Sequence, residues 1–219
     1  MVWGSAALGL VVLLAIVDRG VATAAARAIS DGVAEAGCAS ASISTELHDF
    51  PLLTQLARGR LNRVTVTLDD VRDRGAPLDS VVLDLYDVST SQPRTAGRVE
   101  LVATVSPADL RAVAGRGWDV AVGDGALVVT GMDDSTPVQF RLAPRFAEGR
   151  LRFDLRDVLL FGSPVAGDRI PTEIVDAVSR LDSDLQDLPF DLDPTDVRVE
   201  QAGLVVRAAG TDVDVNGAC

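Results

Sequence analysis

Two long stretches of alternating residues constrain the fold of this chain more than any other feature. In residues 61–72, aliphatic side chains alternate with polar ones, and the apolar set is Val64, Val66 and Leu68. Residues 78–90 alternate in the same way, and Arg74-Gly75-Ala76-Pro77 supplies a turn between the two stretches. Because successive side chains of a strand point to opposite faces, this pattern predicts an antiparallel hairpin with one apolar face. Such a face has to be covered, so the hairpin predicts a sheet that packs on one side only.

Two long helices and several shorter strands are predicted around this hairpin. The spacing of apolar residues predicts an amphipathic helix over residues 18–36, ended by Gly37, and a second helix that starts at Pro171. Ser106-Pro107-Ala108-Asp109 has the N-cap, the first-turn proline and the early acid of a short helix. Further strands are expected at residues 41–48, 98–105, 118–122, 126–130, 138–142, 151–155, 196–200 and 204–208. This order predicts an α+β fold on antiparallel sheet, in a single domain over residues 18–219.

Residues 1–17 form a separate segment, because positions 2–17 are almost wholly apolar and end at Asp18-Arg19. As a helix this stretch would rise about 24 Å, which is short of the roughly 30 Å hydrocarbon core of a bilayer. The segment is therefore expected to be a signal peptide or a short N-terminal membrane anchor. Ala22-Thr23-Ala24 offers small residues where a signal peptidase would cut, so removal and retention both stay open. The alternative is a buried apolar helix of a cytosolic protein.

Charge narrows the class of partner. The chain carries a formal net charge of −12, and all 20 of its basic residues are arginine. A surface that binds DNA or RNA needs a basic field to neutralise phosphates, so no nucleic-acid partner is expected. The same charge opposes broad adhesion to anionic lipid, and an anionic head group would have to be met by a few arginines. The exclusive use of arginine is typical of a GC-rich genome.

Cys38 and Cys219 are the two cysteines of the chain, and no CxxC spacing occurs. They do not suffice for a zinc site. In an exported protein they are expected to form one disulfide between the end of the first helix and the last strand. Closing so long a loop contributes roughly 4–5 kcal/mol in the chain-entropy model. The alternative is a pair of free thiols in a reducing cytosol.

Residue types that perform chemistry are scarce. His48 is the only histidine, it stands beside Asp49, and the sequence holds no GxSxG motif for a serine nucleophile. Two acidic runs, at residues 182–184 and 191–196, approach the spacing of calcium ligands but lack the required glycine and distal glutamate. The glycines near residues 115–125 do not continue into a phosphate-binding helix start. We therefore expect no enzyme activity, no metal and no cofactor, and a protein that acts by binding.

Several motifs carry a family resemblance. The most specific is Phe50-Pro51-Leu52-Leu53-Thr54-Gln55, which follows the Asp18-Arg19 pair and an Ala-rich helix. Pro77-Leu78 between two strands, Ser106–Leu110 at a helix start and Leu188–Phe190 before the final strands add to it at the level of pattern. With these motifs the chain resembles the actinobacterial LmeA-like phospholipid-binding family over essentially its whole length. The resemblance implies a fold like that of tubular lipid-binding proteins, in which a long curved antiparallel sheet wraps around helices and encloses room for acyl chains.

The resemblance and the apolar patterns together suggest which residues contact lipid. The candidates for the acyl chains are apolar residues of the Phe-Pro segment and of two helices, namely Phe50, Leu52, Leu53, Leu56, Leu110, Val113, Ile174, Val178 and Leu181. The candidates for the head group are Arg58, Arg60 and Arg63, because guanidinium groups match phosphate geometry. The alternatives are ordinary core packing for the apolar residues and a solvated surface for the arginines.

The predicted function is that of an exported phospholipid-binding protein on the periplasmic side of the plasma membrane, anchored or secreted. The resemblance implies a lipid carrier or presenter of the cell envelope, with a role in the assembly of lipid-anchored glycans. One alternative is an anchored structural or interaction module without a lipid ligand. Another is a hydrolase that uses carboxylates, because paired acids cannot be recognised from sequence alone. Phospholipid and, through the N-terminal segment, the membrane are the expected partners.

Overall fold

Two antiparallel sheets make up most of the computed structural model, which describes residues 18–27, 29–31, 42–73, 76–114, 117–133, 136–147, 149–165, 170, 178, 183–184 and 189–215. Sheet 1 has the order β1-β2-β3-β4-β12-β11, and sheet 2 has the order β10-β8-β7-β6-β5 with β9 paired to β8. The strands of sheet 1 are β1 (Ser42–Leu47), β2 (Arg60–Asp73), β3 (Ala76–Ser89), β4 (Thr95–Val105), β11 (Asp193–Glu200) and β12 (Gly203–Asp214). The strands of sheet 2 are β5 (Trp118–Gly123), β6 (Ala126–Asp133), β7 (Thr136–Ala147), β8 (Arg150–Leu160), β9 (Ser163–Pro164) and β10 (Ser183–Asp184).

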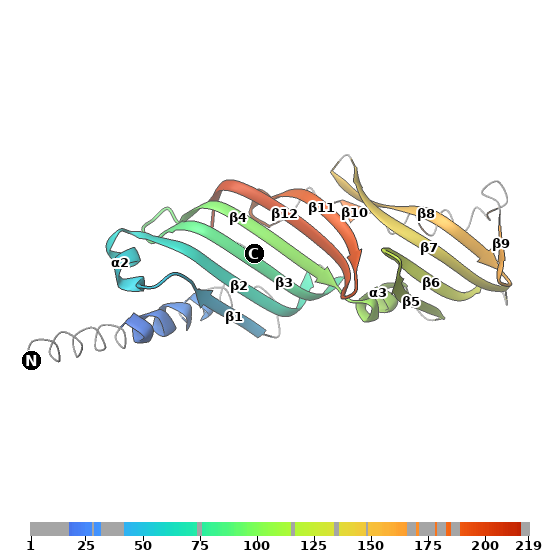
Figure 1. Ribbon diagram of the computed structural model, residues 1–219, viewed down its shortest axis with the longest axis horizontal. Coiled ribbons are helices and arrows are strands. Elements are labelled where there is room, and N and C mark those ends of the chain that lie inside the picture. The colour runs from blue at the N-terminus through green and yellow to red at the C-terminus, as the bar shows by residue number, and fades with distance from the viewer. Residues whose placement is uncertain are drawn as a thin grey trace, which may run out of the picture.

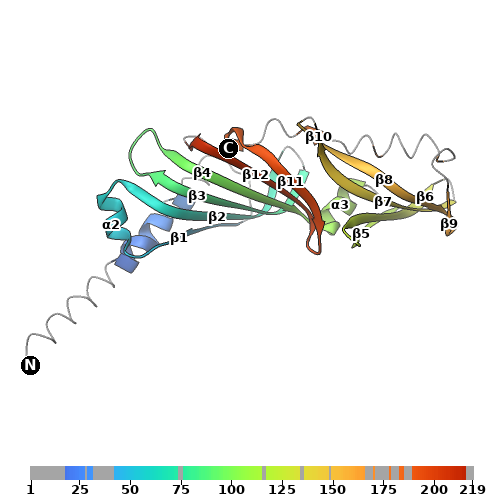
Figure 2. The same ribbon diagram turned by 45° about the horizontal axis from the view of Figure 1, so that its top comes forward.

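The helical elements in the described ranges are short. Residues 18–27 and 29–31 are helical and will be called the N-terminal helix. The labelled helices are α2 (Leu52–Ala57), α3 (Pro107–Ala114) and the 3-10 turn η2 (Pro189–Asp191). In Figures 1 and 2 the N-terminal helix lies beside β1 and α2, at the end of sheet 1 that is remote from sheet 2.

Sheet 1 is formed by two separate parts of the chain, β1–β4 and β11–β12. It leaves sheet 1 after β4, passes through α3, forms sheet 2, and returns as β11 and β12. On its return β12 pairs with β4 over ten residue pairs from Leu204–Val105 to Asp214–Thr95. The two sheets therefore lie end to end along the molecule (Figure 1), with β11 in contact with β6 and β7.

These elements form a mostly antiparallel β structure with few helices, which fits an α+β or a mainly-β fold. The described strands form two sheets, however, where one long sheet was expected. The reason is that the free edge of β4 pairs with β12 and not with β5, while α3 redirects the chain into a second set of strands. The division into one domain over residues 18–219 stays a prediction.

Local signals account for the ends of several elements. Ser106 caps α3, because the amide N of Asp109 donates to Ser106 Oγ at 3.2 Å and that hydroxyl donates to the Asp109 carboxylate at 2.6 Å. Gly59 ends α2 with φ of 73°, a left-handed conformation that glycine adopts without strain. The β5–β6 hairpin turns at Asp124 and Gly125, which both have positive φ, as a two-residue turn requires.

Candidate lipid-binding surface

The inner face of sheet 1, defined by Val64, Val66 and Leu68, is a continuous apolar surface. Strand register places Leu47, Val64, Leu85 and Val99 in one row across β1–β4. The N-terminal helix covers this face at β1, where its apolar side chains pack on the same core and Ser30 Oγ lies 2.9 Å from Thr45 Oγ1. The helix residues in that contact are Val21, Ala22 and Ile29. Among the described residues, Leu52 and Leu56 of α2 and Phe190 also pack on this core, so the apolar side of sheet 1 is covered, as the alternating sequence predicted.

A second, separate buried cluster joins the near end of sheet 1 to sheet 2. Val199 and Leu204, at the β11–β12 turn of sheet 1, belong to the same buried cluster as the inner residues of sheet 2. Val178, one residue of the predicted second helix, is also buried in that cluster. The sheet 2 members are Val120, Leu127, Val129, Val138, Phe140, Leu142, Leu151 and Val158.

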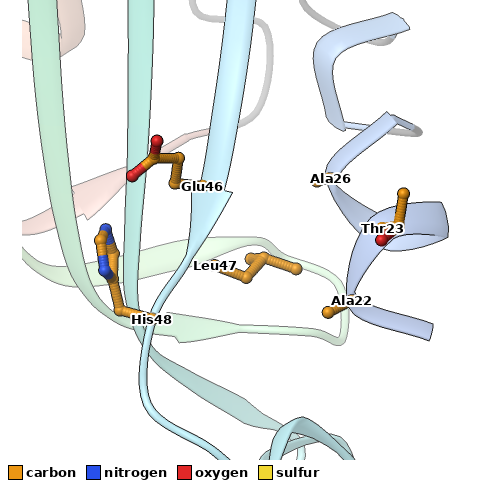
Figure 3. Close-up of a pocket in the computed structure, with 6 residues that line it drawn as sticks. All are labelled: Ala22, Thr23, Ala26, Glu46, Leu47 and His48. Atoms are coloured by element: carbon orange, nitrogen blue, oxygen red, sulfur yellow. The ribbon is translucent and has the colours of Figure 1, made fainter. Parts of the chain in front are cut away.

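A hollow separates the N-terminal helix from the edge strand β1. It is open to solvent, has a volume of about 270 Å³, and is lined by Ala22, Thr23, Ala26, Glu46, Leu47 and His48. Figure 3 shows Leu47 pointing across the gap toward Ala22, while Glu46 and His48 point away from the helix. On the helix side the hollow is lined by the small side chains of Ala22, Thr23 and Ala26. Its volume lies just below the 300–1,000 Å³ of usual ligand pockets, and it is an open depression and not an enclosed cavity.

Gln55 holds the Phe-Pro segment against the first long strand. Its side chain is 4% exposed. The amide nitrogen donates to the backbone oxygens of His48 and Asp49, and the amide oxygen accepts from the backbone N–H of Asn62 at 2.8 Å. Three backbone groups from both sides of α2 are therefore satisfied by one side chain. Gln55, the last residue of the Phe50–Gln55 motif, thus holds the backbone of the motif in place.

Asp18 caps α2 from a distant part of the chain. Its carboxylate accepts from the amide N of Leu53 at 2.7 Å, and the residue is 3% exposed. Pro51, at the N-cap position of α2, provides no side-chain cap of its own. A carboxylate is favoured at a helix start, where unpaired N–H groups point outward. Asp18 therefore joins the start of the N-terminal helix to α2.

The outer face of sheet 1 carries a network of charged and polar side chains. Arg63 donates two hydrogen bonds to Asp84 Oδ1 and one to Oδ2, and Thr65 donates to Asp84 Oδ1 at 2.5 Å. His48 Nε2 lies 2.9 Å from Thr65 Oγ1. Burial alone would raise the pKa of Asp84, but the hydrogen bond from Thr65 and the pairing with Arg63 outweigh it and hold that pKa below its usual range. The hydrogen bond to Asp84 in turn raises the pKa of Arg63.

Tyr86 extends this network to the next strand. The guanidinium carbons of Arg63 and Arg98 lie 5.5 Å and 4.5 Å from the centre of its ring. Arg98 also pairs with Glu100 at 3.2 Å. These groups belong to the face opposite the aliphatic core, so they fasten strands β2–β4 together and do not line the apolar interior.

The structure separates the predicted acyl-chain residues of the Phe-Pro segment. Leu52 is buried in the core of sheet 1 and Leu56 packs partly against it, whereas Phe50 and Leu53 are exposed. Leu110 on α3 and Val178 pack with the core of sheet 2. Ile174 and Leu181 and the side chain of Val113 lie outside the described part of the structure. A lipid-contacting role stays a prediction for all nine residues.

The three head-group candidates also differ in their surroundings. Arg63 is committed to Asp84 on the outer face of sheet 1. Arg58 and Arg60 are exposed on either side of Gly59 and form no ion pair among the described residues. The predicted disulfide partners, Cys38 and Cys219, lie outside the described residues, so that pairing stays a prediction.

Sequence reasoning missed Asp18 and Gln55 as structural residues. The apolar stripes and alternating strands of the sequence assigned no structural role to either residue. Their partners, Leu53 and Asn62, lie 35 and 7 positions away in the sequence. The available signal for Gln55 was its place in the Phe-Pro motif, since an amide can bond to backbone N–H and C=O groups at once.

The sequence of this chain matches a protein-family model. The family model described as LmeA-like phospholipid-binding matches residues 16–209. The match covers most of the chain, from the end of the apolar N-terminal stretch to β12, and the chain belongs to this family. No curated protein and no solved structure matches the chain.

No helix in the described ranges is both long and apolar enough to cross a bilayer. In the same ranges, no three side chains of histidine, cysteine, aspartate or glutamate come together as metal ligands would.

Proposed function

We propose that this protein is an exported, non-enzymatic phospholipid carrier or presenter at the outer face of the plasma membrane. The observation that carries the proposal is the aliphatic inner face of sheet 1, covered at β1 by a helix whose small residues leave a hollow. Membership of a phospholipid-binding family supports the same ligand class. A role in assembling lipid-anchored glycans is the cell-envelope task that the sequence resemblance implies.

Hydrocarbon would bind by burial alone. Each methylene group removed from water contributes about 0.8 kcal/mol, so a tail needs no polar partner to be held. The hollow opens beside β1, and a tail entering there would reach the row of Leu47, Val64 and Leu85 if the helix moved away from the sheet. A curved sheet around helices, as in tubular lipid-binding proteins, would enclose the tail along the length of the molecule.

Retention of the N-terminal segment is part of the proposal. A cut after Ala24 would remove Asp18 from the start of α2 and would remove Val21 and Ala22 from the core of sheet 1. Their burial supports an anchor over a cleaved signal peptide. N-terminal sequencing of protein purified from membranes tests this, since a mature chain beginning at Arg19 or later would contradict it.

Solvent extraction of the purified full chain is the direct test of lipid binding. We expect phospholipid in the extract, and a matching mass increment in native mass spectrometry. Ala26→Trp fills the hollow and should lower the bound lipid severalfold, whereas Ala24→Trp, on an exposed position of the same helix, should not. An extract without phospholipid would overturn the proposal.

A structural module without a lipid ligand is the second candidate. It is favoured by the close filling of the described interior, where Val99, Val138, Leu142 and Val158 are almost completely buried. Such a module would yield no phospholipid on extraction, and Ala26→Trp would change nothing that depends on lipid.

A further inference from the structure

The short helix α2 presents apolar side chains to solvent at one end of the molecule. Phe50 is 64% exposed and Leu53 is 37% exposed, while Leu52 between them is buried. We call Phe50, Leu53, Arg58 and Arg60 the α2 tip. Single exposed apolar residues are common on proteins, so exposure alone assigns no role to the tip.

The α2 tip is held in place by buried polar side chains. Gln55 fixes the backbone before and after the helix, and Asp18 caps its start at Leu53. The exposed side chains are therefore carried by an ordered segment and not by a loose loop. Ordering before contact lowers the entropy that is lost when a surface is bound.

The charge of the tip is opposite to that of the whole protein. Between residues 49 and 60 two arginines and one aspartate give a net charge of +1, against −12 for the chain. Arg58 and Arg60 are exposed and form no ion pair with other described residues, whereas Arg63, a few residues on, is paired with Asp84. Arginine beside exposed aromatic and aliphatic groups matches the interface of an anionic bilayer, where each base near the surface contributes favourably.

The position of the tip points to the same partner. Asp18, which contacts α2, directly follows the apolar stretch at residues 2–17. A bilayer engaged by that stretch would lie next to α2. The other end of the molecule also exposes apolar side chains, Met132 and Phe161, but there the sequence continues from Met132 into Asp133-Asp134.

We propose that the α2 tip docks on the anionic surface of the bilayer that holds the N-terminal segment. Phe50 and Leu53 enter the interfacial layer, and Arg58 and Arg60 contact lipid phosphates from the rim. This contact sets the hollow beside β1 close to the membrane from which a lipid would come. The inference rests on the proposed function for its choice of a bilayer as partner.

The test uses the full chain in vesicles of equimolar phosphatidylcholine and phosphatidylglycerol. Phe50→Trp introduces a fluorophore at the tip, and phospholipids brominated on their acyl chains quench indoles that enter the bilayer. We expect clear quenching beyond that of the native tryptophans. Phe161→Trp is the matched control on an equally exposed position at the far end, and it should show none.

Charge reversal tests the basic half of the tip. In the Phe50→Trp background, Arg58→Glu or Arg60→Glu should lower the ratio of docked to undocked protein about fivefold each in these vesicles. Arg156→Glu, an exposed arginine on β8, should leave it unchanged. In pure phosphatidylcholine the reversals should have little effect.

Two results would overturn the docking proposal. One is equal quenching of Phe50→Trp and Phe161→Trp, and the other is no added quenching at Phe50. Failure of docking differs from failure of lipid binding, because solvent extraction of the same preparations reports bound phospholipid independently. A tip that stays unquenched by vesicles but is shielded by a co-purifying protein would assign the surface to a protein partner instead.

Discussion

The two sheets differ in how their inner faces are filled. Sheet 2 is packed by rings as well as aliphatic groups, with Trp118 and Phe140 in edge contact at 5.7 Å between ring centres. Gly131 makes room for this, because a Cβ there would overlap the Trp118 ring. The inner face of sheet 1 is aliphatic, and the part of the N-terminal helix beside β1 meets it with alanine and threonine. The inner face of sheet 1 is therefore built from aliphatic side chains, whereas aromatic rings also pack on the inner face of sheet 2.

The polar faces differ as well. In sheet 1, Asp84 receives hydrogen bonds from Arg63 and Thr65 on the neighbouring strand and is only 22% exposed. In sheet 2 the Arg145–Asp154 pair is 47% exposed on both sides. Exposed pairs contribute little because water screens them, and less exposed pairs contribute more. The Arg63–Asp84 pair of sheet 1 is thus less exposed than the Arg145–Asp154 pair of sheet 2.

Shortening a core side chain of sheet 2 should have the largest effect. Leu142 is 1% exposed, and Leu142→Ala should lower the free energy of unfolding by about 2–5 kcal/mol. Leu47→Ala, beside the hollow of sheet 1, should cost less than about 2 kcal/mol, because fewer neighbours surround that side chain. Urea unfolding measures both. Equal losses would show that the two sheets are packed alike.

Removing the Gln55 side chain should have the next largest effect. Gln55→Ala leaves the backbone N–H of Asn62 without its partner and should cost about 1–3 kcal/mol. Thr54→Ala, at the exposed neighbouring position, should stay within about 0.5 kcal/mol of the wild type. If both variants unfold at the same denaturant concentration, Gln55 does not order α2.

Neutralising Asp84 should destabilise the protein by about 1–2 kcal/mol at neutral pH. Its pKa in the folded protein is lower than in the unfolded chain, so the unfolded state takes up its proton first as the pH falls. The stabilisation is complete above the ordinary carboxyl pKa of about 4 and is lost as the pH falls through the folded value. The gap between wild type and Asp84→Asn should therefore close in acid, which urea unfolding at a series of pH values can follow.

Breaking the exposed pair of sheet 2 should have the smallest effect. Asp154→Asn should change the free energy of unfolding by no more than about 1 kcal/mol, and added salt should reduce the difference further. An effect as large as that of Asp84→Asn would remove the contrast between the two outer faces.

Much of the strand content was predictable, and its limits have identifiable causes. The second strand of the β7–β8 pair was predicted to end at Leu155, and the next two residues are Arg156 and Asp157. In the structure β8 continues through these two residues, because the register shifts there: Phe140 pairs with Val158, and Leu142 pairs with Leu155. A bulge places two residues opposite one, so alternation resumes beyond it. The end predicted from periodicity was wrong because periodicity cannot detect a bulge.

The candidate site was predictable in kind more than in detail. The Phe50–Gln55 motif singled out the segment that leads into α2. Which of its side chains face the core depends on how α2 sits on β2, and there Leu52 is buried while Phe50 is exposed. That choice follows from the contacts of Gln55 and Asp18 with the backbone of other segments.

By itself, the sequence determined the features whose physical cause is local. Alternation along a strand decides which side chains share a face, and Ser106 provides the cap of α3 within three residues of its partner. The tertiary structure decided the features that depend on distant partners. The pairing of β4 with β12 and the capping of α2 by Asp18 join groups far apart in the sequence. The local sequence of β4 does not specify β12 as its partner, and the local sequence of α2 does not specify Asp18 as its cap. Backbone N–H and C=O groups can pair with any suitable group that the packing of the chain brings close to them.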